Sequence, residues 1–358
     1  MPTTRALVAI GAAATMLALA ACGTGGTGPA AAPEQAEQSG ASAATAADGA
    51  LVIYSGRNEK LVGPLLEQLE QAVGTKVQVR YGDSASMAAQ LLEEGERTQA
   101  DLFFSQDAGA LGALAKQGRL APLASGVTSR VVDGYADDQG RWVATSARAR
   151  VIAYDPQRAP TVADATSSDV VLDPQYKGRI GYAPTNASWQ SFVTALRVAK
   201  GEDGARDWLT RFKAQEPRAY EKNTGVLEGV EAGEVDLGLI NHYYWHLRVA
   251  EVGKDKVDSK IRFLDSTDPG ALVNVAGVGV LAGSDQAQAA AKAVDFLLGT
   301  PAQTYFADET AEYPVVPGVS TTTHELPPLT TLKRPAVDLN DLDSLPQTLE
   351  LLGQVGLT

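Results

Sequence analysis

The chain has 358 residues and a formal net charge of −13 at pH 7, because it contains 43 Asp and Glu against 30 Lys and Arg. This charge disfavours nucleic acid and anionic lipid as partners, since both are themselves negatively charged. The part of the chain that can fold, roughly 300 residues, is too long for one hydrophobic core and predicts two lobes.

The amino terminus has the pattern of a bacterial lipoprotein signal. Arg5 precedes a run of small and apolar residues at 6–21, which ends in Leu-Ala-Ala before Cys22, the only cysteine of the chain. The pattern predicts a signal peptide over residues 1–21 and a lipid on Cys22. We therefore expect a protein anchored on the extracytoplasmic face of the cell membrane; a secreted protein with an incidental cysteine is the alternative.

Residues 22–49 are rich in Gly, Ala, Ser and Gln and have almost no large apolar side chain. Such a segment cannot bury enough surface to offset its conformational entropy, which predicts a disordered tether. Beyond the tether, no apolar run reaches the ~18 residues that a membrane-spanning helix needs.

The folded part begins with three repeats of strand, polar corner and helix. Apolar or alternating runs predict strands at 51–54, 76–81 and 101–105. A segment with helical spacing follows each of them, at 59–73, at 84–95 and from residue 108 to Gly118. This alternation predicts a parallel sheet with helices on both faces.

A second lobe shows the same alternation. Its expected elements are a strand at 179–183, a polar corner at 184–188, helices at 189–199, 204–213 and 225–232, and a buried strand at 234–239. Two more helices are expected at 287–298, packed on the first lobe, and at 345–353 near the C-terminus.

Two long extended runs, at 142–154 and 274–281, depart from this alternation of strand and helix. We interpret them as hinge crossings of an α/β protein with two lobes and a ligand cleft, the arrangement of a hinge-closing solute binder. Arg148 and Arg150 lie on the first crossing, and we expect one of them to face solvent. The predicted boundaries are 50–148 plus 275–320 for lobe 1 and 149–274 plus 321–358 for lobe 2.

Two adjacent tyrosines, Tyr243 and Tyr244, follow the buried strand at 234–239. Open α/β sheets bind ligands at the carboxyl ends of their strands. A phenol has a pKa of about 10 and becomes a ligand when a hard cation displaces its proton. Such ions prefer oxygen donors, so the pair is compatible with a ferric site. The pair alone leaves open that one tyrosine packs in the core and the other caps a helix.

Several segments, in this order and spacing, resemble the periplasmic ferric-binding proteins, the iron receptors of bacterial ABC importers. They are YSGRN at 54–58, DLFFSQ at 101–106, RARVIAY at 148–154, IGYAPT at 180–185, LINHYYWH at 239–246, DPGAL at 268–272 and EYP at 312–314. The resemblance implies a type II periplasmic-binding-protein fold, a permease and an ATPase as partners, and no catalytic activity. We also expect a monomer.

Through the resemblance, Tyr243 and Tyr244 are the expected phenolate ligands of Fe(III). A synergistic anion, phosphate or carbonate, would be held by Asn186, Ala187, Ser188, Asn223 and Asn241. Because these residues are small and polar and lie at expected helix starts, they also suit an anion on physical grounds.

The first lobe departs from the pattern of the family. Asn58 stands where many relatives have histidine, and Gln106 stands where many have glutamate; both amides are weaker metal donors. Where some relatives have a further tyrosine, this chain has Glu59, which could supply a carboxylate. We expect the first lobe to contribute little, or only Glu59, with anion or water in the remaining positions.

Two other functions are compatible with the same sequence. A receptor for a phosphorylated or phosphonate organic anion would use the corner at 186–188 and the arginines, with both tyrosines only lining the pocket. An exported hydrolase would need a nucleophile paired with a base, but no Gly-x-Ser-x-Gly motif and no His-Glu-x-x-His metalloprotease motif occurs in the sequence.

Overall fold

The computed structural model of the chain describes residues 49–265, 268–335 and 337–358. The predicted signal peptide, the lipidation site Cys22 and the tether up to residue 48 lie outside this part of the chain. Within it, every helix is too short or too polar to cross a membrane.

The first lobe is built on three parallel strands in the order β2-β1-β3, extended by antiparallel partners. These strands are β1 (Leu51–Ser55), β2 (Val77–Tyr81) and β3 (Leu102–Ser105). The helices are α1 (Glu59–Val73), α2 (Ser84–Glu94), α3 (Ala108–Lys116), α7 (Ala287–Leu297) and α8 (Thr300–Asp308). The parallel sheet and the first three helices are confirmed. The carboxylates of Asp83 and Asp107 cap α2 and α3 by accepting from backbone N–H groups, at 2.8 and 3.0 Å.

The second lobe repeats the pattern with shorter strands. These are β5 (Ile180–Tyr182), β6 (Arg218–Ala219), β7 (Leu237–Asn241) and β8 (Lys260–Arg262), with the helices α4 (Ala187–Ala214), α5 (Asn223–Glu231) and α6 (His242–Val252). Helix α4 covers both helices predicted at 189–199 and 204–213. It is broken at Gly201, whose φ of 72° lies in the left-handed region that glycine tolerates.

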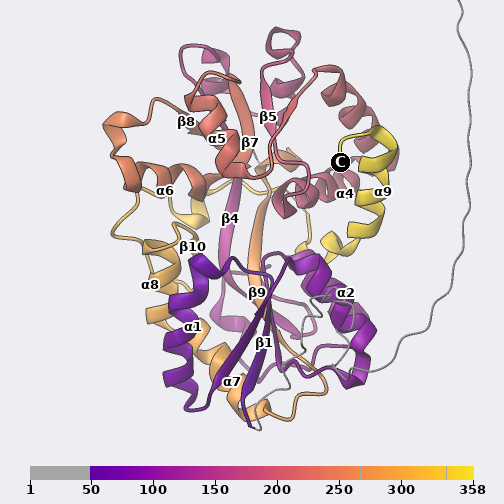
Figure 1. Cartoon of the computed structure of the whole chain (residues 1–358), viewed down its shortest axis with the longest axis vertical. Helices are drawn as coiled ribbons and strands as arrows, with labels where there is room; N and C mark the ends of the chain where they lie inside the picture. The colour runs from indigo at the N-terminus through magenta and orange to yellow at the C-terminus, as the bar shows by residue number, and fades with distance from the viewer. Residues whose placement is uncertain (1–48, 266–267, 336) are drawn as a thin grey trace, which may run out of the picture. The chain divides into compact units, whose positions relative to one another are not determined.

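Two strands, β4 (Trp142–Tyr154) and β9 (Val273–Val280), run side by side between the lobes (Figure 1). On its other edge β4 pairs first with β10 (Tyr313–Pro314) and then with β7, whereas β8 pairs with residues 152–154 of β4 from the edge opposite to β7. Both crossings are confirmed, and so is the two-lobed fold class. The exact lobe boundaries stay a prediction.

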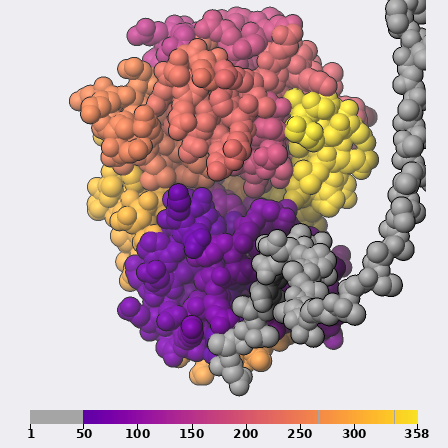
Figure 2. Space-filling model, viewed as in Figure 1, coloured from indigo at the N-terminus to yellow at the C-terminus, as the bar shows by residue number. Residues whose placement is uncertain are grey.

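The C-terminal segment contacts both lobes as well. The 3-10 helix η9 (Leu339–Asp343) packs on α3, where the carbonyl oxygen of Leu342 lies 2.4 Å from the position that a Cβ of Gly109 would occupy. The following helix α9 (Leu345–Val355) lies beside α4, and Figure 2 shows this segment in yellow at the surface. The hydroxyls of Thr194 and Thr348, 2.7 Å apart, join α4 to α9.

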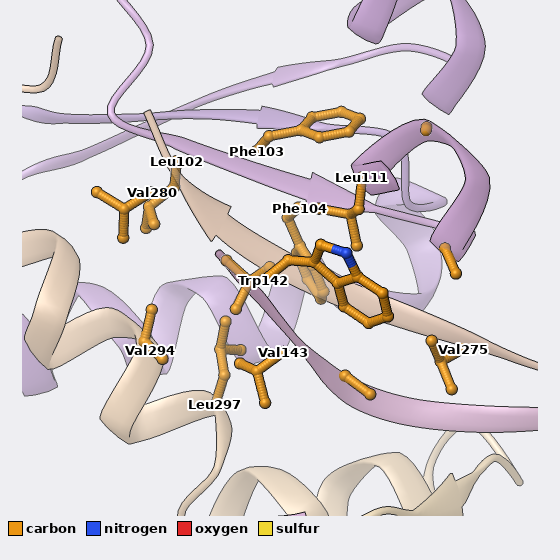
Figure 3. Packing of buried hydrophobic residues seen from close by; sticks show 14 of the residues in the cluster. Leu102, Phe103, Phe104, Leu111, Trp142, Val143, Val275, Val280, Val294 and Leu297 are labelled. Carbon is orange, nitrogen blue, oxygen red and sulfur yellow. The ribbon is translucent and has the colours of Figure 1, made fainter. Parts of the chain in front are cut away.

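The buried hydrophobic residues of the described chain form one large cluster and two smaller ones. One large cluster joins β1, β3, β4 and β9 to α1, α3 and α7, and it includes Leu339 and Leu342 of η9. Figure 3 shows part of this cluster, in which Phe103 and Phe104 point to opposite sides of β3, as successive residues of a strand do. A second cluster is centred on α4 and contains four of its aromatic side chains, Trp189, Phe192, Trp208 and Phe212.

Candidate ligand cleft

A cavity of about 380 Å³ lies between strand ends and helix starts of both lobes. The first lobe contributes the corners after β1, β2 and β3, at residues 56–58, 82–84 and 106–107. The second lobe contributes the corner at 185–188 and the end of β7 with the start of α6. This is the edge at which α/β sheets bind ligands.

Tyr243 and Tyr244 both line the cavity at the start of α6. Their ring centroids are 4.2 Å apart and their planes are inclined by 30°. Tyr243 is 3% exposed and Tyr244 is half-buried. Burial, together with the neighbouring phenol of Tyr244, raises the pKa of Tyr243 well above its ordinary value. Without a cation, Tyr243 is therefore a neutral phenol at pH 7.

The corner before α4 is held by its own side chains. Asn186 caps the helix by accepting from the backbone N–H of Ser188 at 3.0 Å and from its hydroxyl at 2.7 Å. The amide of Asn223 donates to Asn186 at 3.2 Å and to the hydroxyl of Ser188 at 3.0 Å. Asn186, Ala187 and Ser188 line the cavity, whereas Asn223 is buried behind them. The first turn of α4 therefore meets the cavity, in a position that favours an anion.

Asn241, the last residue of β7, also lines the cavity. It occupies the cap position of α6, but its side chain accepts no hydrogen bond from the helix. The cleft thus contains Asn241 beside the tyrosines, on the same side as the corner at 186–188.

Both hinge arginines face the cleft, which corrects the expectation that one of them faces solvent. Arg148 and Arg150 line the cavity and are each 3% exposed. The physical reason is the period of two in a strand, which puts residues i and i+2 on the same face. Burial lowers the pKa of Arg148, and it lowers that of Arg150 to about 9.

The two guanidinium groups reach toward different lobes. Arg148 donates to the carbonyl oxygen of Gln106, in the first lobe. Arg150 donates to the carbonyl oxygen of Ser188 at 3.0 Å, and it lies 5.0 Å from the ring centroid of Phe192. Within the described residues, two nitrogens of each guanidinium group have no hydrogen-bond partner. Unpaired buried donors of this kind favour a bound anion.

The three first-lobe residues of the prediction have different positions. Asn58 lines the cavity and uses its side-chain oxygen to cap α1, accepting from the backbone N–H of Lys60 at 2.9 Å. Gln106 lines the cavity, and its backbone N–H donates to the hydroxyl of Ser84 at 2.8 Å. Glu59 is exposed in the first turn of α1, outside the set of residues that line the cavity.

Sequence reasoning missed a buried ion pair beneath the cleft. Arg57 lines the cavity and binds Glu312 through two nitrogens, at 2.9 and 3.1 Å, with both side chains fully buried. Ser146 also donates to Glu312. Both residues fall inside segments that carry the family resemblance, but a sequence separation of 255 residues hides the pairing from sequence alone.

It also missed Asp107, which follows Gln106 and lines the cavity. Burial raises the pKa of this carboxyl group, while its bonds to the start of α3 and the nearby Arg148 act in the opposite direction. The available signal was a polar residue directly after β3, where the structure shows that Asp107 also caps α3.

The donors of the cleft fit a hard, trivalent cation. No group of three or more His, Cys, Asp or Glu side chains in the described part of the chain could hold a metal ion. The paired phenols are hard oxygen donors once deprotonated, whereas the carboxylates of Asp83 and Asp107, which also line the cavity, already cap α2 and α3. The phenols and the anion-favouring corner at 186–188 line the same cavity, so the cleft offers donors to a cation and to an anion.

The family profile described as bacterial extracellular solute-binding protein matches residues 98–339. The chain is therefore a solute-binding protein of this class. It is 34% identical over 309 residues to the major ferric iron-binding protein of Neisseria meningitidis serogroup B, covering 86% of this chain and 93% of that one. It is also 34% identical over 315 residues to the Fe(3+)-binding periplasmic protein of Serratia marcescens, covering 87% and 91%.

Iron-bound HitA from Pseudomonas aeruginosa has a similar structure, with a TM-score of 0.79 and 32% identity. The match covers 86% of this chain and 99% of HitA. These identities and this structural match show that the chain belongs to the periplasmic ferric-binding protein family and has a type II periplasmic-binding-protein fold.

Proposed function

We propose that this chain is an extracytoplasmic receptor that captures Fe(III) and delivers it to an ABC permease driven by a cytoplasmic ATPase. The observation that carries the proposal is the pair of phenols, Tyr243 and Tyr244, in contact with each other on the wall of the cleft. The names of the relatives, a ferric iron-binding protein and an Fe(3+)-binding periplasmic protein, support the same cargo.

In this proposal both tyrosines bind the ion as phenolates. Two phenolates leave a ferric ion with one net positive charge, and Arg148 and Arg150 add two more in a buried site. Buried charge is costly unless it is compensated. A phosphate or carbonate bound by Asn186, Ala187, Ser188 and Asn241, with Asn223 supporting the corner, would reduce this excess.

The first lobe closes the site without a strong metal ligand, because the carboxylates of Asp83 and Asp107 at its wall cap α2 and α3. Asn58 and Gln106 are available at the opposite wall as neutral amides, and water or the anion fills the remaining positions. Glu59 would have to leave its exposed place on α1 to reach the ion. The protein acts as a monomeric binding protein and not as an enzyme, and a lipid on Cys22 holds it at the membrane.

The second candidate is a receptor for a phosphorylated or phosphonate organic anion. The buried nitrogens of Arg148 and Arg150 without a partner favour this function, because guanidinium groups bind phosphate oxygens strongly. In that case the tyrosines would only line the pocket.

A metal-retention experiment separates the two functions. The protein is stripped with a chelator, incubated with ferric citrate or with a phosphate ester, desalted, and analysed for iron and phosphorus. The iron receptor retains about one ferric ion per chain, with or without added phosphate ester. Retention of the ester by a protein that holds no iron would contradict the proposal and favour the second candidate.

A further inference from the structure

On the edge of β4 that pairs with β10 and β7, the strand pairing is interrupted at the point where β4 leaves the first lobe. On this edge, β10 pairs with β4 as far as Ala147, and β7 begins to pair with it at Arg150. Ala149 lies between these two ladders. A buried backbone N–H or C=O group without a hydrogen-bond partner is costly. The backbone groups of Ala149 on this edge therefore need a partner other than β10 or β7.

The side chain of His242 fills this gap. Its Nδ1 atom is 3.2 Å from the backbone nitrogen of Ala149 and 3.3 Å from the carbonyl oxygen of the same residue. With Nδ1 unprotonated, the imidazole accepts from the N–H of Ala149; the other tautomer donates to its carbonyl oxygen. His242 is fully buried, so water does not compete for this contact.

The side chain of His242 contacts the first lobe, although His242 itself belongs to the second. The ring of His242 stacks on Tyr313 of β10, with centroids 4.6 Å apart and planes inclined by 22°. His242 is also the first residue of α6 and directly precedes Tyr243. One imidazole therefore connects a first-lobe strand, the crossing strand and the start of the helix that presents both phenols.

From this geometry we propose that His242 is the pivot of the hinge. It is a positioning residue that makes Ala149 the point at which β4 bends. The position of this bend in turn determines the direction in which the phenols approach the first lobe on closure. Without its hydrogen bond, the bend spreads over neighbouring residues of β4, and the two walls of the cleft no longer meet in one geometry. The consequence for iron rests on the proposed function; the consequence for the hinge does not.

Two substitutions separate the two contacts of His242. His242→Phe keeps an aromatic ring against Tyr313 but cannot accept from Ala149. His242→Asn keeps an acceptor near the position of Nδ1 but loses the stacking. The matched control is His246→Phe, because His246 is also buried in α6, 5% exposed, but makes no hydrogen bond to β4.

The first measurement follows the hinge alone, without ligand. Spin labels on cysteines at Glu67 and Asp207, exposed in α1 and α4, report the distribution of distances between the lobes in a Cys22→Ser background. We expect a broader distribution in His242→Phe than in the unsubstituted protein, and an unchanged one in His246→Phe and His242→Asn. Equal widths in all four proteins would overturn the proposal, whatever the ligand is.

The second measurement follows release of ferric ion to an excess of chelator. Loss of a buried hydrogen bond of this kind corresponds to roughly tenfold faster release from His242→Phe, with iron still bound because both phenols remain. His242→Asn should release iron at nearly the original rate. Equal acceleration in His242→Phe and His246→Phe would mean that His242 is only structural. If neither the unsubstituted protein nor any variant binds iron, the proposed function is wrong. The distances between the spin labels still test whether His242 is the pivot of the hinge.

Discussion

The rings of Tyr243 and Tyr244 lie with their centroids 4.2 Å apart, although they belong to consecutive residues of a helix. Consecutive helical side chains do not normally face each other. Here both point to the same cavity because the pair occupies the first turn of α6, directly after β7 ends. Two phenolic oxygens are thus available to one bound ion.

Binding of ferric ion should release protons. Tyr243 is protonated before binding because burial and the phenol of Tyr244 raise its pKa, and a phenol must lose its proton to bind the metal. Affinity therefore rises with pH and falls as the solution becomes acidic. Calorimetry in two buffers of different ionisation enthalpy measures the release. The double variant with phenylalanine at both positions is the control, and a proton count equal to that of the control would contradict phenolate ligation.

Replacement of Arg150 should weaken anion binding without loss of stability. Arg150 is buried and holds Ser188 at the corner before α4. In Arg150→Met the rise of the melting temperature on addition of phosphate should become smaller, since an anion that binds the native state stabilises it. A buried charge without a counter-charge is itself costly, so its replacement by an apolar side chain of similar length should not destabilise the fold. Arg218→Met removes an exposed arginine and is the control; an equal response to phosphate in both variants would exclude a role for Arg150.

The buried pair of Arg57 and Glu312 should be a strong determinant of stability. Removal of one partner leaves the other as an uncompensated buried charge, which costs about 3–5 kcal/mol. We expect this loss in the free energy of unfolding for Arg57→Met, measured with urea. The double variant Arg57→Met/Glu312→Leu should recover much of it. Additive losses in the double variant would show that the two side chains do not act as a pair.

A methyl group on α3 tests the contact with the C-terminal segment. A Cβ on Gly109 would lie 2.4 Å from the carbonyl oxygen of Leu342, so Gly109→Ala should destabilise the protein by about 1–3 kcal/mol. At Gly112, three residues further along the same helix, the nearest atom would be 3.5 Å away. Gly112→Ala should be tolerated, or stabilise by about 0.5–1 kcal/mol through helix propensity. Equal melting temperatures of the two variants would contradict the packing of η9 on α3.

Much of the fold could be predicted because its signals are local. The alternation of strand, corner and helix and the extended run at 142–154 are both visible within short windows of sequence. Gly201 is a local signal as well, and it lies between the two helices predicted within α4.

The features that sequence did not predict depend on contacts between distant residues. The pairing of Arg57 with Glu312 and the packing of η9 on α3 join segments that are far apart along the chain. The expectation for Arg148 and Arg150 was wrong for a different reason, because the period of a strand was not applied to two residues on the same crossing. The resemblance drew attention to Tyr243, Tyr244 and the corner at 186–188, which the structure brings to one cavity; their roles as ligands stay a prediction.

Phenolate ligation has a direct optical test. Chelator-stripped protein is titrated with ferric citrate while the visible absorption is recorded for the unsubstituted chain, Tyr243→Phe and Tyr244→Phe. A charge-transfer band should grow to saturation near one ferric ion per chain, and each substitution should weaken or abolish it. A colourless iron-loaded protein, or a band unchanged in both variants, would contradict iron capture by these two tyrosines.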